Sequence, residues 1–160
     1  MQEKFLCVAV SIIFWQPAKA AEYRVSPDTD LEPIVKNAQP GDIFLLVDGT
    51  WTDASLKFEQ LHGTAESPIR IQAEHAGQVV FSGKTSFRFS GTYVEVSGLV
   101  FRNLNASSDV VQLRTHSERL AHHSRVTQCL FEQGTADDSQ IESRWLSVYG
   151  THNRIDHCAF

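Results

Sequence analysis

One spacing of apolar residues recurs three times in the second half of the chain. Val96, Leu99 and Phe101 are separated by three and then by two positions, and the same spacing returns at 126–131 and 155–160. The repeats begin at positions 96, 126 and 155, which are 30 and 29 residues apart. Self-similarity at a nearly fixed period of this length is typical of a solenoid, in which each repeat stacks on the previous one.

The same spacing indicates where the chain bends. A step of three residues reverses the face of a flat strand, so one strand cannot direct all three side chains inward. A corner after Val96, joining two short strands, restores a common direction. Coils of this length also supply the crossover that parallel strands need. The pattern therefore predicts an all-β parallel β-helix whose core contains three columns, Val96/Val126/Ile155, Leu99/Cys129/Cys158 and Phe101/Phe131/Phe160.

Further strands are predicted upstream of these repeats. Residues 69–73 alternate with period two, and 43–47 form a continuous apolar run. Extended segments are also expected at 21–25, 51–58, 79–81, 87–89 and 93–96. Turn-forming and polar residues predict loops at 62–68, 103–109 and 115–123.

Residues 21–42 predict an N-terminal strand followed by a capping helix. Asp30 is a suitable helix N-cap, and Pro33 falls in the first turn, where a missing N–H costs little. The apolar positions that follow share one helical face and comprise Leu31, Ile34, Val35 and Ala38. Such a helix would cover the open end of the coils, which we expect to occupy 43–160 and to be incomplete at the C-terminus.

Residues 1–20 resemble an export signal. The apolar run from Phe5 to Trp15 is shorter than the roughly 20 residues of a membrane span. Pro17 ends the run, and Ala18-Lys19-Ala20 places small residues where a signal peptidase reads them. The alternative is a buried N-terminal segment. We favour the signal, which predicts a periplasmic or extracellular protein that is not held in a membrane after the signal is removed.

Charge and cysteine content narrow the classes of partner. The chain carries a net charge of −5; removing 1–20, with two lysines and one glutamate, gives −6. This balance does not suggest a nucleic-acid surface, although a local basic groove could still attract an anion. Cys7 lies in the predicted signal. Cys129 and Cys158 occupy equivalent repeat positions, close enough for a disulfide, but we favour two free thiols stacked in the core.

Several polar residues could be taken for a functional site. A metal site is one interpretation of the histidines, but no helix aligns them, and we favour loop and turn positions for His116, His122, His123, His152 and His157. The acidic residues Asp137, Asp138 and Glu142 lack the spacing of a calcium loop and are expected to be solvated. Asp156 with His157, and Asn153, are interpreted as turn residues. A groove for an anionic polymer could include Lys84, Arg102, Arg114 and Arg144, although solvated charges are the simpler interpretation.

Four stretches in order resemble polysaccharide lyase family 6, which includes alginate lyases acting on poly-mannuronate and the dermatan-cleaving chondroitinase B. They are Ala38–Trp51 with its Pro-Gly-Asp motif, Ser67–Glu74, Val94–Asn103 with Ser-Gly-Leu-Val-Phe, and Trp145–Phe160 with Asn-Arg-Ile-Asp-His-Cys. The likeness covers residues 22–160. It implies a right-handed parallel β-helix and β-elimination on an anionic uronate polysaccharide, most simply alginate.

The resemblance also implies which parts of the machinery to expect. In this family Ca²⁺, held by acidic and Asn side chains, is understood to neutralise the uronate carboxylate, while a Lys acts as base and an Arg lies near the leaving oxygen. By the family's order these residues follow position 160. We therefore expect no catalytic and no metal-binding residue in this chain, no bound Ca²⁺, and no activity of the chain alone.

Two further hypotheses remain open from the sequence. The chain could be a non-catalytic β-helical module that binds polysaccharide or caps a larger assembly. It could also be a β-helical hydrolase or a relative of the pectate lyases, because a fold alone does not fix function. In any of these cases Ile155–Phe160 would form an apolar edge prone to self-association.

Overall fold

The computed structural model describes residues 20–105, 109–132 and 144–160. The predicted signal segment, apart from Ala20, lies outside these residues, as do Asp137, Asp138 and Glu142. The described part of the chain contains no helix with the length and apolarity needed to cross a membrane.

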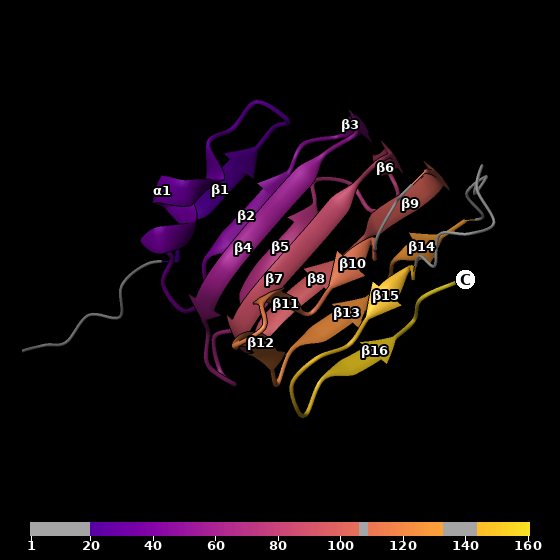
Figure 1. Ribbon diagram of the computed structural model, residues 1–160. Helices are drawn as coiled ribbons and strands as arrows, with labels where there is room; N and C mark the ends of the chain where they lie inside the picture. The colour runs from indigo at the N-terminus through magenta and orange to yellow at the C-terminus, as the bar shows by residue number, and fades with distance from the viewer. Residues whose placement is uncertain (1–19, 106–108, 133–143) are drawn as a thin grey trace, which may run out of the picture.

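Three mainly parallel sheets surround one apolar core, and successive turns of the chain add one strand to each sheet (Figure 1). Sheet A contains β1 (Glu22–Val25), β2 (Ile43–Leu46), β5 (Ile69–Ala73), β8 (Val94–Ser97), β13 (Arg125–Thr127) and β16 (Arg154–Asp156). Sheet B contains β3 (Gly49–Thr52), β6 (Val79–Gly83), β9 (Leu99–Leu104) and β14 (Leu130–Phe131). Sheet C contains β4 (Ser55–His62), β7 (Ser86–Thr92), β10 (Val111–Gln112) and β15 (Leu146–Ser147), joined by β11 (Arg114–His116) and β12 (Arg119–His122). The predicted parallel β-solenoid is confirmed.

The predicted corner between sheets A and B is formed by residues in the left-handed region of backbone space. Gly98, Gln128 and His157 have φ values of 75°, 54° and 51°. Each follows a sheet A strand, so the chain bends there and the next apolar side chain again faces the core. As a consequence Val126 is the direct register partner of both Val96 and Ile155.

The predicted aromatic column is confirmed and is longer than the repeats suggest. The rings of Phe101 and Phe131 lie 4.9 Å apart at 6°, and those of Phe131 and Phe160 lie 5.0 Å apart at 3°. Upstream, the column continues through Phe81 to Trp51, which are register partners on β6 and β3. The first four rings are buried, whereas Phe160 is 66% exposed.

The N-terminal cap forms as predicted. Helix α1 (Leu31–Lys36) begins after Asp30, whose side chain accepts a hydrogen bond from the Glu32 amide. Val35 is buried against the core, with Leu31, Ile34 and Ala38 packed partly against it. Strand β1 pairs in parallel with β2 and extends sheet A. The buried Asp42 accepts hydrogen bonds from the Ala21 and Gln39 amides and so joins this cap to the coils.

Two predictions of local structure were wrong. The extended segment expected at 51–58 is broken by Asp53, with φ of 54°, into the end of β3 and the start of β4. The loop expected at 115–123 contains most of an antiparallel hairpin, β11–β12. Its strands carry mostly polar and charged residues, so the sequence has the composition of a loop, and backbone pairing alone reveals the hairpin.

A column of close backbone contacts follows sheet C. Leu61, Gly91 and Ala121 are register partners on β4, β7 and β12. Gly91 has φ of 123°, and a Cβ built on it would lie 1.8 Å from the carbonyl oxygen of Leu61. A Cβ on Gly150 would lie 1.9 Å from the carbonyl oxygen of Ala121. Only glycine fits these two positions without moving the neighbouring turn.

Candidate functional site

The histidines do not converge on a metal site. His123 and His152 stack face to face, with ring centroids 4.5 Å apart at 3°, and Tyr93 stacks on His123 at 5.0 Å. All three residues have positive φ, so this ladder marks a second series of corners. Within the described residues, no group of three His, Cys, Asp or Glu side chains could hold a metal ion. The prediction of turn positions is confirmed for His123, His152 and His157.

His116 and His122 lie elsewhere than the sequence suggested. Both belong to the β11–β12 hairpin, at the ends of its two strands. The Nδ1 atom of His122 accepts a hydrogen bond from the Thr151 amide at 3.2 Å and lies 3.0 Å from the Thr151 hydroxyl. His122 therefore ties the hairpin to the next turn of the solenoid.

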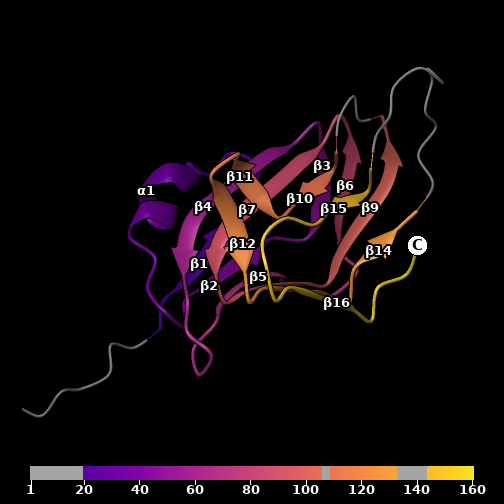
Figure 2. The ribbon, with the colours of Figure 1, turned by 60° about the horizontal axis from the view of Figure 1, so that its bottom comes forward.

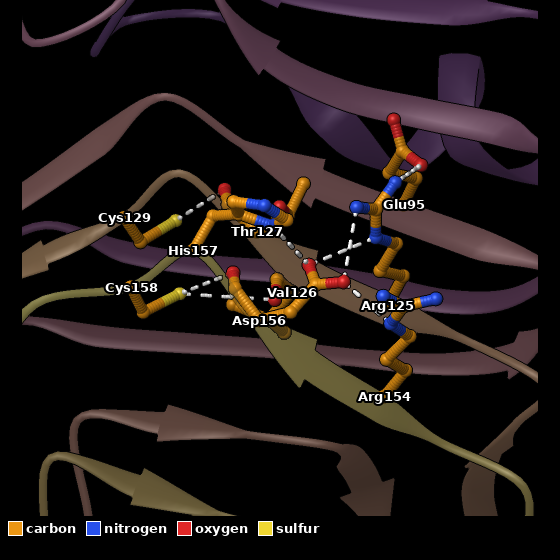
Figure 3. A network of polar contacts seen from close by, with 9 residues as sticks. All are labelled: Glu95, Arg125, Val126, Thr127, Cys129, Arg154, Asp156, His157 and Cys158. Atoms are coloured by element: carbon orange, nitrogen blue, oxygen red, sulfur yellow. Dashed lines mark hydrogen bonds and ion pairs between the residues drawn. The ribbon is translucent and has the colours of Figure 1, made fainter.

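Asp156 belongs to a compensated ion-pair network on the outer face of sheet A (Figure 3). Arg125 donates to both carboxylate oxygens, at 3.0 Å and 3.1 Å, and Arg154 pairs with the same group. Arg125 also reaches Glu95 at 3.4 Å. The Arg125 guanidinium, and then the Thr127 hydroxyl, hold the pKa of the Asp156 carboxyl well below its usual range. Asp156 ends β16 instead of lying in a turn, and it is a poor proton acceptor.

Asn153 has the backbone role that the sequence predicts. Its side-chain nitrogen donates to the carbonyl oxygens of Ala121 and Tyr149, both at 2.9 Å. Its side-chain oxygen accepts from the Ser124 amide at 3.0 Å. All of these partners are backbone groups, so Asn153 holds two turns together.

Cys129 and Cys158 are free thiols, as the sequence favours. Cys129 is 2% exposed, and burial raises its pKa to about 12. The two thiols donate to the carbonyl oxygens of Thr127 and Asp156 within their own turns. Neither has the depressed pKa of a catalytic cysteine.

A row of polar side chains crosses the outer face of sheet C. Lys57, Arg88, Gln112 and Ser147 are successive register partners on β4, β7, β10 and β15. They point outward because the preceding residues of the first three strands (Leu56, Phe87 and Val111) are buried in the core. The row therefore runs across the strands, along the axis of the solenoid.

The β11–β12 hairpin borders this row and is held against β4 and β7 (Figure 2). Arg119 pairs with Glu59 at 2.7 Å, and the Thr115 hydroxyl donates to Glu59 at 3.2 Å. Thr115 also lies 2.9 Å from the buried Ser90 hydroxyl. Lys57 and Arg119 lower the pKa of Glu59 from 4.5 to about 2. Glu59 is therefore ionised at neutral pH, and two cations share its charge.

Positive charge predominates along this surface. Arg114 lies over the ring of Tyr149, 3.8 Å from its centroid, and Arg88 donates to the Ser86 hydroxyl. We call Lys57, Arg88, Arg114 and Arg119 the sheet C cations; Glu59 is the only carboxylate that pairs with them among the described residues. The hairpin turn adds the exposed Glu118. At the far end Asp109 accepts from Ser147 at 2.6 Å and pairs with Arg144.

The sequence identified this surface only in part. Of the four residues proposed for a groove, Arg114 and Arg144 lie on or beside it. Lys84 lies at the corner after β6, and Arg102 pairs with Glu132 on sheet B. Lys57, Arg88 and Arg119 were missed. Their signal is alternation with buried residues, which places Lys57 and Arg88 outward, but nothing in the sequence aligns them with one another.

A cleft opens at the N-terminal end of the row. It lies between α1 and β4, encloses about 820 Å³, and is lined by Lys36, Lys57, Glu59 and His62 among others. Both signs of charge line it. The row of sheet C cations thus continues into a concave polar surface next to the capping helix.

Fold and surface together define a parallel β-solenoid that exposes a cationic face along its axis. The sequence comparisons agree with this class: the family model for chondroitinase B matches residues 25–160, and the chain belongs to that family. The comparison with curated protein sequences gives no match.

Solved structures of similar proteins extend this finding. The PL6 family alginate lyase AlyGC is 34% identical with a TM-score of 0.79, over 86% of this chain and 19% of that one. A mannuronic acid specific polysaccharide family 6 lyase from human gut microbiota is 30% identical with a TM-score of 0.71, over 86% and 33%. A PL6 polysaccharide lyase from Pseudopedobacter saltans, at 22% identity and a TM-score of 0.72, supports the fold alone. The chain thus spans between a fifth and a third of these structures' lengths, and the resemblance to polysaccharide lyase family 6 is confirmed.

Proposed function

We propose that this chain is the N-terminal part of an exported polysaccharide lyase of the alginate-cleaving type, which breaks uronate glycosidic bonds by β-elimination. In this proposal the described coils bind the acidic polymer and do not perform the elimination. The family match over residues 25–160 carries the proposal, and the sheet C cations supply a surface suited to a polyanion.

The elimination sets chemical requirements that can be compared with the described residues. The C5 proton of a uronate becomes acidic enough only when the carboxylate beside it is neutralised. A base with a pKa near the working pH then removes that proton, and an acid assists the leaving oxygen. Glu59, with a pKa of about 2, is too weak a base. Asp156 is compensated by arginines, and the Cys129 thiol is buried.

Calcium is part of the proposal for the whole lyase and not for these coils. The described residues contain no set of carboxylates or histidines that could hold a metal ion, so they do not fit such a site. We assign the calcium ligands, the base and the acid to coils outside these residues. We also propose export, on the basis of the signal-like segment 1–20, to the periplasm or the cell exterior.

A second candidate function is a non-catalytic module that binds acidic polysaccharide. The observation in its favour is that the sheet C face has an excess of cations, while the described residues lack a suitable acid–base pair. Both candidates predict the same behaviour for this chain alone, and they differ in whether a longer protein carries the chemistry.

The test is to incubate the purified chain with poly-mannuronate and with dermatan sulfate. Equilibrium binding and the absorbance of unsaturated uronate products are then measured. We expect binding that weakens as salt is added, without new absorbance. Turnover by this chain would refute the proposal that its chemistry lies elsewhere. Failure to bind any uronate polymer at low salt would refute both candidate functions.

A further inference from the structure

We propose that the sheet C cations form a carboxylate-binding strip for acidic polysaccharide, holding sugar units remote from the bond that is cleaved. The inference rests on the proposed function and deepens it, because it names the contacting residues and the direction of the bound polymer. Lys57 and Arg88 form the centre of the strip. Arg114 and Arg119 flank it on the hairpin side.

The first observation is a juxtaposition of like charges. Lys57 and Arg88 are direct register partners on β4 and β7. Like charges directly opposite one another on neighbouring strands destabilise a sheet. On sheet A the register partners Arg125 and Arg154 are bridged by Asp156, so that pair is compensated within the protein.

Sheet C lacks an equivalent bridge. Glu59 pairs with Lys57 and with Arg119, so its single charge is divided between them. The one side-chain partner of Arg88 among the described residues is the neutral Ser86 hydroxyl. An external carboxylate placed between Lys57 and Arg88 would provide what Asp156 provides on sheet A.

The second observation is that the hairpin orients two further cations. Arg119 is held by Glu59, and Arg114 is held by the ring of Tyr149. A guanidinium that stacks through its face keeps its in-plane N–H donors available for a carboxylate. Arg114 has no acidic partner among the residues that the structure describes. The hairpin therefore forms a cationic wall beside the row.

The third observation is the direction of the row. Register partners on adjacent parallel strands are about 4.8 Å apart, and Lys57 and Arg88 belong to successive turns. The row therefore presents cations at the spacing of the coils, along the solenoid axis. A polyuronate carries one carboxylate on every sugar, so an extended chain lying along this axis can pair successive carboxylates with successive turns. One end of the polymer would lie in the cleft between α1 and β4.

The experiment compares charge-neutral variants on two faces of the full chain. Lys57→Gln, Arg88→Gln and the double variant remove charge from the strip. Arg70→Gln removes the same charge from the outer face of sheet A, where Arg70 is the register partner of Glu95. Arg88→Lys keeps the charge at the central position. Binding of poly-mannuronate and of a neutral mannan is measured at several salt concentrations, and each variant's fold is checked by circular dichroism.

Each neutral substitution in the strip is expected to weaken poly-mannuronate binding about twofold to fivefold, as for an exposed ion pair. The double variant should lose about fivefold to twentyfold and show a shallower salt dependence. Arg70→Gln and Arg88→Lys should bind as the unchanged chain does, and the neutral mannan should bind weakly throughout.

Two outcomes overturn the strip while leaving the proposed function intact. In one, the double variant binds poly-mannuronate as tightly as the unchanged chain. In the other, Arg70→Gln weakens binding as much as Arg88→Gln, which would indicate an unspecific effect of net charge. If the unchanged chain binds no uronate polymer, the proposed function itself fails. Should the double variant not fold, the comparison of Arg88→Gln with Arg88→Lys decides between these outcomes.

Discussion

Replacing Phe101 with alanine tests whether the aromatic column stabilises the solenoid. Phe101 is 1% exposed and lies between two rings, with Phe81 at 5.1 Å and Phe131 at 4.9 Å. A buried Phe→Ala substitution costs about 3–5 kcal/mol through lost transfer free energy and the cavity left behind. Each well-placed aromatic pair contributes about 0.5–1.5 kcal/mol beyond area burial. We therefore expect Phe101→Ala to lower the free energy of unfolding by about 4 kcal/mol.

Phe160→Ala is the matched control in the same column. Phe160 is 66% exposed and stacks on Phe131, so most of its surface is already in contact with water. Its removal should cost about 1 kcal/mol, since roughly a third of a Phe side chain is withdrawn from solvent. Phe101→Leu keeps an apolar side chain but loses both ring contacts, and it should fall between the two alanine variants.

Urea unfolding followed by circular dichroism measures these differences. With a slope of about 2 kcal/mol/M, a loss of about 4 kcal/mol lowers the midpoint by about 2 M, and a loss of about 1 kcal/mol lowers it by about 0.5 M. Tryptophan fluorescence should report the same midpoints if unfolding is cooperative. Equal midpoints for Phe101→Ala and Phe160→Ala would refute the reasoning, because burial and stacking would then have no effect on stability.

Three further predictions follow from local geometry. Gly91→Ala should destabilise the chain by at least about 2 kcal/mol more than Gly49→Ala: both positions have positive φ and carry backbone strain, but a Cβ meets the Leu61 carbonyl at Gly91 and nothing within 4 Å at Gly49. Similar unfolding midpoints would contradict the close approach of the two turns. Because the pKa of Glu59 is lowered from 4.5 to about 2, its ion pairs stabilise the fold above the unfolded value and are lost as pH falls toward 2. Glu59→Gln should remove that part of the pH dependence, and an unchanged acid-unfolding curve would count against the Glu59 ion pairs. In the native chain a thiol reagent should modify the partly exposed Cys158 and spare the buried Cys129 until the protein unfolds, as single Cys→Ser variants would show; equal labelling rates would contradict the burial of Cys129.

The fold could be predicted because sheets A and B have a nearly constant repeat. Val96, Val126 and Ile155 are register partners separated by 30 and 29 residues, and a step of three residues betrays the corner that follows each of them. The cap could be predicted as well, because Asp30 and the apolar face of α1 are local signals. These features depend on burial, which leaves a period in the sequence.

The candidate surface could not be predicted in the same way because sheet C has no constant repeat. From Lys57 to Arg88 is 31 residues, from Arg88 to Gln112 is 24, and from Gln112 to Ser147 is 35. Insertions between the coils produce this variation, so cations that are neighbours in space share no sequence spacing. The Glu59–Arg119 contact joins residues 60 positions apart through a hairpin of loop-like composition. Only the folded arrangement brings these charges together.

Hydrogen–deuterium exchange with and without poly-mannuronate oligomers tests most directly whether this chain binds acidic polysaccharide through the sheet C face. The account predicts slower exchange in β4, in β7 and in the β11–β12 hairpin, with no change in β8 and β13 on sheet A. Protection confined to sheet A, or no protection anywhere at oligomer concentrations that saturate binding, would contradict it.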